Sequence, residues 1–235
     1  MIDKRPTRVA SMFDAIAARY DFLNHLLSVG LDRRWRTQAI RSLHLTGRET
    51  VLDVCTGTGD VALAALRARP GAARVVGVDF AGEMLRHAIG KTREPRVAGR
   101  IWLVRGDATR LPVPTSSMDA ATVAFGIRNV EEPGRALLEM FRVLRTGGRL
   151  AILEFSIPRP AVIRAIYLPY FRDVLPRIGR LVSGHLTAYT YLPASVGAFI
   201  PSDVMLSLMQ ECGFTEVRAR ALTFGVVTLY TGGKP

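Results

Sequence analysis

Cysteine is scarce in this chain of 235 residues, and the two that occur, Cys55 and Cys212, lie far apart in sequence. Such a chain does not have the disulfide framework of a small secreted domain. Its first residues also lack the positively charged and then apolar pattern of an export signal. We therefore expect a cytoplasmic protein.

The sequence also has no internal repeat, no low-complexity block and no Ser/Gly-rich linker that would separate two domains. Hydrophobic residues make up 49% of the chain, which is enough to bury a core and excludes intrinsic disorder. A single domain over residues 1–235 is therefore predicted.

A membrane-spanning helix is not indicated either. Residues 181–202 carry no formal charge, but they include glycine, proline, serine, threonine and histidine. A spanning helix needs about 20 predominantly apolar residues. An uncharged segment of this kind more often covers a pocket or fills a core.

Acidic residues are in the minority: 32 basic residues against 20 acidic ones leave a formal charge of +12. Arginine supplies 29 of the 32. This balance favours an anionic partner, and both nucleic acids and membrane headgroups have that property.

Apolar residues recur at helical spacing from residue 7 to 28, and short apolar runs then alternate with helical patterns. Strands are predicted over 50–55, 74–79, 101–105, 118–124 and 149–155, and helices over 60–69, 81–90 and 132–144. This alternation predicts an α/β fold with a Rossmann-like, mostly parallel, doubly wound sheet.

The order changes near the C-terminus. A helix is predicted around 202–212, and the strand-like runs 216–222 and 226–231 follow with only a short turn between them. Parallel neighbours need a much longer crossover, so we expect an antiparallel hairpin at the sheet edge.

A glycine-rich turn follows the first predicted strand. Gly57-Thr58-Gly59-Asp60-Val61-Ala62 fits the Gly-x-Gly-x-x-Gly/Ala pattern, and Asp79 lies about 20 residues further on, at the end of the next strand. The two glycines let the backbone approach a ligand, and the carboxylate can accept hydrogen bonds from ribose hydroxyls. Nicotinamide dinucleotides and S-adenosylmethionine both meet these requirements.

Two further acids favour S-adenosylmethionine. Asp53, within the first strand, can act on the ammonium group of this cofactor through water or turn amides, whereas it would repel a pyrophosphate. Asp107 follows the third strand, where it can accept from an adenine amino group while the Ala108 N–H donates to a ring nitrogen. Three acids at successive strand positions indicate this cofactor more specifically than the glycines alone.

With these features placed, the chain resembles class I S-adenosylmethionine-dependent methyltransferases, and more narrowly the ubiquinone/menaquinone biosynthesis C-methyltransferases. The motifs that carry this narrower resemblance are Val9-Ala10-x-Met12-Phe13-Asp14-x-Ile16-Ala17-x-Arg19-Tyr20-Asp21-x-Leu23-Asn24, Leu26-Leu27-Ser28-x-Gly30-x-Asp32-x-x-Trp35-Arg36, Phe125-Gly126-Ile127-Arg128-Asn129-Val130, Leu153-Glu154-Phe155-Ser156 and Tyr189-x-Tyr191-Leu192-Pro193-x-Ser195-Val196. They span nearly the whole chain and lie outside the generic cofactor site.

The resemblance implies carbon methylation of a polyprenylated quinol, with demethylmenaquinol converted to menaquinol. A benzoquinol of the ubiquinone pathway is the alternative substrate, and a nucleic-acid methyltransferase is a more distant one. The resemblance also implies a helical cap over 1–48 and an insertion over 158–200 that covers the substrate.

Cofactor contacts implied by the resemblance fall on Thr58 in the turn, Asp79 at the ribose and Asp107-Ala108 at the adenine. Met84 is expected to pack against the adenine. Where many relatives have serine after the fourth strand, this chain has Ala124, so only backbone atoms could make a contact there.

The reaction needs no metal, but a group must accept a quinol proton and a group must stabilise the resulting oxyanion. Arg128 and Asn129, after the fourth strand, are expected at the pocket rim, with Arg128 stabilising the oxyanion or orienting a water. Tyr20 and Asp21 are candidates for the base or for closing the pocket. The sequence does not rank them.

The prenyl tail gives the basic charge a second explanation. Five arginines and one acid lie between Pro158 and Ser202, and they are interleaved with Ile163, Ile166, Tyr167, Tyr170, Phe171, Val174, Leu175 and Ile178. This composition suits an interfacial helix and favours peripheral contact with the inner face of the cell membrane. Nucleic acid is disfavoured, because the sequence after Ala124 lacks an Asn/Asp-Pro-Pro-aromatic motif. The oligomeric state stays open, a homodimer being one arrangement.

Overall fold

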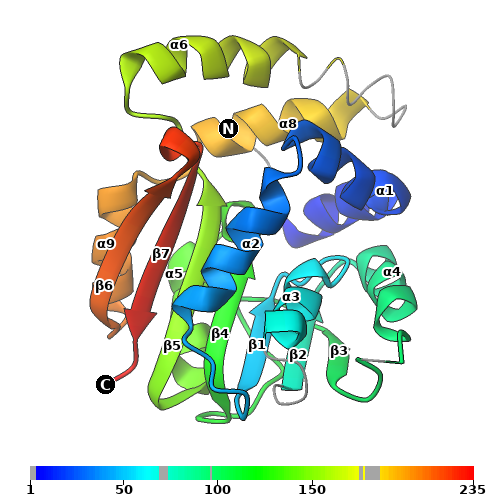
Figure 1. Cartoon of the computed structure of the whole chain (residues 1–235), viewed down its shortest axis with the longest axis vertical. Helices are drawn as coiled ribbons and strands as arrows, with labels where there is room; N and C mark the ends of the chain where they lie inside the picture. Colours follow the sequence, from blue (N-terminus) through cyan, green and yellow to red (C-terminus); the bar gives the residue numbers. More distant parts are fainter. Residues whose placement is uncertain (1–3, 69–73, 96, 175–176, 178–185) are drawn as a thin grey trace.

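The computed structural model describes residues 4–68, 74–95, 97–174, 177 and 186–235, and it shows one seven-stranded sheet with helices on both faces (Figure 1). The strand order is β3-β2-β1-β4-β5-β7-β6. The strands are β1 (Thr50–Val54), β2 (Arg74–Asp79), β3 (Ile101–Arg105), β4 (Met118–Ala124), β5 (Leu144–Phe155), β6 (Thr215–Leu222) and β7 (Val227–Gly233).

The first five strands run parallel, whereas β7 is antiparallel to β5 and β6 is antiparallel to β7. This topology confirms the predicted doubly wound sheet and the C-terminal hairpin. One boundary was wrong: the strand predicted from residue 149 begins at Leu144. Its pairing with β4 shifts from Met118↔Leu144 to Ala120↔Arg149. A bulge therefore lets the strand continue through Gly147 and Gly148.

Helices fill the connections between the strands. They are α1 (Pro6–Leu27), α2 (Leu31–Ser42), α3 (Asp60–Ala68), α4 (Gly82–Thr92), α5 (Pro133–Val143), α6 (Ala161–Pro169), α8 (Leu186–Gly197) and α9 (Ser202–Glu211), with the short turns η1 (Ile127–Asn129), η2 (Tyr170–Val174) and η3 (Thr223–Gly225). Residues 178–185, which include Arg180 of the predicted insertion, lie outside the described residues.

Within the described residues, no single helix has the length and hydropathy of a membrane span. One pair, Tyr191–Gly197 and Ser202–Glu211, reaches these values only when taken together across a bend of 69°.

The core has three parts. On one face of the sheet, Leu52 and Val54 pack with apolar residues of α5 and α9. On the other face, Val51 packs with apolar residues of α2 and α3. A third cluster joins α1, α4, η2 and α8. In Figure 1, α1, α6 and α8 lie at the end of the sheet where β4 and β5 finish. The third cluster therefore covers the carboxyl ends of the parallel strands.

Candidate active site

The glycine-rich turn after β1 adopts a shape that requires glycine. Gly57 and Gly59 have φ values of +55° and +81°, which are strained for residues with side chains. A Cβ at Gly59 would also lie 3.3 Å from the Ala88 Cβ of α4. The Gly57 N–H donates to the Asp79 carboxylate over 2.8 Å, so the turn and the end of β2 are fixed together.

A cavity of about 240 Å³, which we call the cofactor cavity, opens over this turn. Among the residues predicted from the sequence, it is lined by Gly57, Asp79, Met84, Asp107, Ala108, Ala124 and Asn129. Six further lining residues were not expected from the sequence: Lys4, Pro6, Phe80, Thr109, Glu131 and Glu132. Elements distant in sequence therefore meet at the carboxyl ends of β1, β2 and β4.

The charge of the cofactor cavity fits S-adenosylmethionine, which carries a sulfonium and an ammonium group. Its lining holds the carboxylates of Asp79, Asp107, Glu131 and Glu132 against one ammonium group, that of Lys4. Burial and the nearby Arg128 lower the pKa of Lys4. A pyrophosphate would meet this set of acids at an electrostatic cost. Buried Asn129 adds a carbonyl oxygen that has no hydrogen-bond partner among the described residues.

Asp53 lies under the turn and does not line the cofactor cavity. Its Oδ2 accepts hydrogen bonds from the Thr56 hydroxyl, over 2.6 Å, and from the Ala62 N–H, over 3.1 Å. Burial raises the pKa of this carboxyl to about 7. The geometry therefore makes Asp53 a support of the turn, and any contact with the cofactor ammonium would have to pass through another group.

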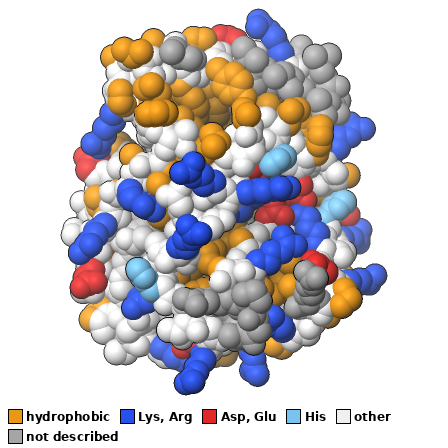
Figure 2. Space-filling view, in the orientation of Figure 1, with side chains coloured by type: hydrophobic (Ala, Val, Ile, Leu, Met, Phe, Trp, Pro, Cys, Tyr) orange, Lys and Arg blue, Asp and Glu red, His pale blue; other side chains and the backbone are white. Residues whose placement is uncertain are grey.

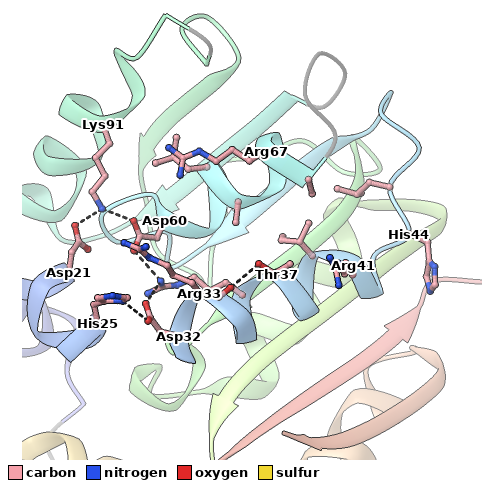
Figure 3. Close-up of a pocket in the computed structure, with 16 residues that line it drawn as sticks. Asp21, His25, Asp32, Arg33, Thr37, Arg41, His44, Asp60, Arg67 and Lys91 are labelled. Atoms are coloured by element: carbon pink, nitrogen blue, oxygen red, sulfur yellow. Dashed lines mark hydrogen bonds and ion pairs between the residues drawn. The ribbon is translucent and has the colours of Figure 1, made fainter. Parts of the chain in front are cut away.

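Thr58 and Asp21 meet on the outer side of the turn. The Thr58 hydroxyl donates to Asp21 of α1. The Lys91 ammonium group of α4 donates to the Thr58 hydroxyl and forms ion pairs with Asp21 and Asp60. Figure 3 shows Lys91 reaching across to Asp21 and Asp60. Since neither Thr58 nor Asp21 lines the cofactor cavity, this cluster, the Lys91 latch, fastens α1 to the turn.

A second cavity, of about 230 Å³, lies beside the first. We call it the aromatic chamber, because its walls include Phe13, Tyr20, Trp35, Phe125, Phe155, Tyr167, Tyr170, Phe171 and Tyr191. The rings pack on one another, with the Phe125 and Phe155 centroids 4.5 Å apart. Such walls suit a flat, apolar ring system.

The aromatic chamber and the cofactor cavity have a common wall, formed by Phe13, Tyr20 and Phe125. The sequence neighbours Arg128 and Asn129 fall on different sides of it: Arg128 lines the chamber and Asn129 lines the cofactor cavity. A group held in one cavity is thus next to a group held in the other, as transfer between two bound molecules requires.

Arg128 is held rigidly. Its Nη1 donates to Glu154 over 2.7 Å and to the Phe125 carbonyl over 2.5 Å, and its Nε donates to the Ser195 hydroxyl of α8 over 3.3 Å. The Arg128 N–H also donates to Glu154, over 3.2 Å. Both Arg128 and Glu154 are buried. The guanidinium therefore keeps a fixed position at the chamber wall.

Tyr20 also faces both cavities, and its hydroxyl is hydrogen-bonded to the side chain of Asn24. Burial raises the pKa of this hydroxyl above its ordinary value. Tyr20 is therefore protonated at neutral pH and is suited to donate a hydrogen bond, whereas it is poorly suited to accept the first proton.

Gly126, which precedes η1, lies too close to Cys55 for any residue with a side chain. A Cβ at Gly126 would lie 2.4 Å from the Cβ of Cys55, which itself has φ +54°. Burial raises the pKa of the Cys55 thiol well above its ordinary value, so this cysteine is not a nucleophile.

Comparison with known proteins agrees with this geometry. The sequence model of the ubiE/COQ5 methyltransferase family matches residues 1–234. A ubiquinone/menaquinone biosynthesis C-methyltransferase of Syntrophotalea carbinolica is 50% identical, over 98% of this chain and 93% of the relative. A demethylmenaquinone methyltransferase of Deinococcus radiodurans is 46% identical, over 96% of this chain and 92% of the relative.

Among solved structures, a putative S-adenosylmethionine-dependent methyltransferase of Methanococcus maripaludis is similar in fold. The TM-score is 0.68, and the match covers 94% of each chain at 16% sequence identity. This similarity supports the fold alone.

Proposed function

The chain belongs to the ubiE/COQ5 methyltransferase family and is an S-adenosylmethionine-dependent C-methyltransferase, and we propose that it methylates a ring carbon of a prenylated quinol, demethylmenaquinol. The observation that carries this proposal is the common wall of Phe13, Tyr20 and Phe125. On one side of it lies an acidic cavity suited to a cationic methyl donor, and on the other an aromatic chamber suited to a quinol ring.

In the cofactor cavity, S-adenosylmethionine would supply a methyl group bound to a positively charged sulfur. We expect Asp79 to accept from the ribose hydroxyls and Asp107 from the adenine amino group, with Met84 and Phe80 against the apolar parts. The Asn129 oxygen, which has no described partner, is placed to accept from a donor group in this cavity.

In the aromatic chamber, a quinol carbon becomes nucleophilic when a neighbouring hydroxyl loses its proton, because the oxyanion donates electron density into the ring. Arg128 would stabilise this oxyanion, since it is a permanent cation that Glu154 and Ser195 hold in place. Tyr20, still protonated, would donate a hydrogen bond at the common wall. The first proton would pass to a water that Arg128 orients. Once the methyl group has moved from the sulfur to the ring carbon, that carbon would lose its own proton to water, which restores the aromatic ring.

We further propose that the α6 end of the molecule rests on an anionic membrane. Val162 of α6 and Phe224 of η3 are each 73% exposed, and Ile157 is 42% exposed. Figure 2 shows hydrophobic side chains gathered over this end. The exposed Arg159, Arg164 and Arg172 flank it, and bases near an anionic surface each add roughly 1 kcal/mol of attraction.

Tyr167, Tyr170 and Phe171 differ from the expectation of an interfacial helix, because they line the aromatic chamber. Among the residues that the structure describes, we assign the apolar contribution to a membrane contact to the exposed side chains of Ile157, Val162 and Phe224.

The proposal is tested by giving the purified protein methyl-labelled S-adenosylmethionine with demethylmenaquinol, with a demethylated benzoquinol, or with bulk RNA. We expect label in the naphthoquinol. Label in the benzoquinol alone would favour the ubiquinone-pathway alternative, and label only in RNA would refute the quinol assignment.

A further inference from the structure

Several polar groups that line the aromatic chamber are bonded to other groups of the protein. The Trp35 Nε1–H donates to the Thr223 hydroxyl over 2.7 Å. The Tyr170 hydroxyl donates to the Leu27 carbonyl over 2.9 Å. These two contacts tie the chamber walls together and leave neither donor free for a ligand.

Tyr167 of α6 differs from them. Its ring lines the chamber and stacks on Phe171, with centroids 4.9 Å apart and planes inclined by 20°. Its hydroxyl oxygen is buried and has no hydrogen-bond partner among the residues that the structure describes. A buried hydroxyl without a partner destabilises the fold, so such groups in native proteins call for an explanation.

Tyr167 also lies within electrostatic reach of Arg128, and burial raises its pKa well above the ordinary value. The hydroxyl therefore stays protonated and can donate a hydrogen bond. A para-diol has two ring oxygens that point in opposite directions. Fixing such a ring in one orientation requires a polar group for each oxygen, and Arg128 from η1 can serve only one.

We propose that the Tyr167 hydroxyl is the second anchor of the substrate, donating a hydrogen bond to the diol oxygen that Arg128 does not hold. The inference rests on the proposed function, because it takes an aromatic diol as the ligand of the chamber. Tyr167 is then a residue that determines ring orientation, and so which ring carbon faces the cofactor cavity.

The test is a binding experiment that does not depend on turnover. Quenching of tryptophan fluorescence, to which Trp35 in the chamber wall contributes, reports the binding of a short-chain prenylated 1,4-naphthalenediol under anaerobic conditions. Two mono-ol analogues, each lacking one of the two hydroxyls, are compared with it. The variants are Tyr167→Phe and, as the matched comparison, Tyr170→Phe, which removes a hydroxyl already bonded to the protein.

We expect Tyr167→Phe to bind the diol roughly ten-fold more weakly, the value of one hydrogen bond. One mono-ol should show the same loss, and the other, which lacks the oxygen held by Tyr167, should bind wild type and Tyr167→Phe equally. Tyr170→Phe should show no such dependence on the ligand oxygen. Equal binding of the diol by wild type and Tyr167→Phe, or an equal loss for all three ligands, would overturn the inference.

Methyl transfer by wild type and by Tyr167→Phe is measured in parallel. Tyr167-dependent diol binding without any methyl transfer would refute the proposed function and leave the anchor in place. Methyl transfer that is indifferent to Tyr167 would refute the anchor alone.

Discussion

Arg128 and Glu154 form a buried ion pair at the wall of the aromatic chamber, with Nη1 2.7 Å from Oε1. Glu154 also accepts the backbone N–H groups of Arg128 and Phe155, over 3.2 Å and 2.9 Å. The carboxylate therefore fixes both the side chain and the backbone of the residue to which we assign oxyanion stabilisation. Stability and turnover can be separated at this pair.

Arg128→Ala should destabilise the fold by about 3–5 kcal/mol, because Glu154 is left buried without a counter-charge. Adding Glu154→Gln to this variant should restore part of the loss. Turnover should stay at least roughly 100-fold below wild type in both variants. Urea unfolding and initial rates check this, and a double variant less stable than Arg128→Ala would contradict it.

Asp79 carries the most specific cofactor contact that we assign. Asp79→Ala should weaken S-adenosylmethionine binding by roughly 10- to 100-fold, the value of hydrogen bonds to a charged group. Isothermal titration calorimetry measures this affinity. Asp203→Ala, which removes an exposed carboxylate at the start of α9, is the control and should bind as wild type does. Unchanged affinity in Asp79→Ala would mean that the cofactor cavity is wrongly assigned.

The Lys91 latch should control how firmly α1 closes on the glycine turn. Lys91 and Asp21 are 28% and 37% exposed, so the pair is partly screened by solvent. Lys91→Met should raise the KM for the quinol roughly two- to five-fold and increase hydrogen exchange in α1. Arg86→Met, which removes a cation of α4 paired with Glu83 on the same helix, should change neither.

Asp53 predicts an unusual pH dependence of stability. Its carboxyl has a pKa of about 7 when folded, above its ordinary value, so the folded state binds the proton more tightly. The free energy of unfolding should therefore fall as pH rises from about 4 to about 7, by up to roughly 4 kcal/mol, and then stay level.

In Asp53→Asn this contribution should be absent, so the variant gains stability relative to wild type as the pH rises through that window. Urea unfolding at a series of pH values measures the difference. A difference that does not change with pH would show that Asp53 is ionised throughout.

Membrane contact through the α6 end predicts that a charge placed there weakens binding to anionic vesicles. Val162→Asp should reduce co-flotation with vesicles that contain anionic lipid, because it places a negative charge in the exposed apolar surface. Leu138→Asp is the matched control, since this leucine of α5 is 53% exposed. Equal flotation of Val162→Asp and wild type would contradict the proposed orientation.

The alternating strands and helices, the parallel sheet and the C-terminal hairpin were predictable, because apolar periodicity and the lengths of connections reflect local geometry. The start of β5 was not predictable in this way. The strand continues through Gly147 and Gly148 because a bulge forms in its pairing with β4, which lies far away in sequence. Gly57, Asp79, Asp107 and Ala108 were placed in one cavity from their strand-end positions, and Met84 from the resemblance to the methyltransferase family.

The roles of side chains could not be derived in this way. Thr58 was predicted to contact the cofactor, and Asp21 to act as the base or to close the pocket. Both side chains bond to Lys91 of α4, and only the folded chain brings Lys91 between them. Tyr167 was grouped with membrane-facing residues, because composition does not tell which side of a helix faces a cavity. Glu131 and Glu132 directly follow the motif that ends at Val130, so their proximity to Asn129 was the one available signal.

The wall between the two cavities has a consequence for the binding equilibria of the two ligands. Phe13 and Tyr20 both belong to α1, so a molecule bound in either cavity restrains the same helix. The methyl donor and the acceptor should therefore bind cooperatively. Linkage then requires that the quinol tighten cofactor binding by the same factor by which the cofactor tightens quinol binding.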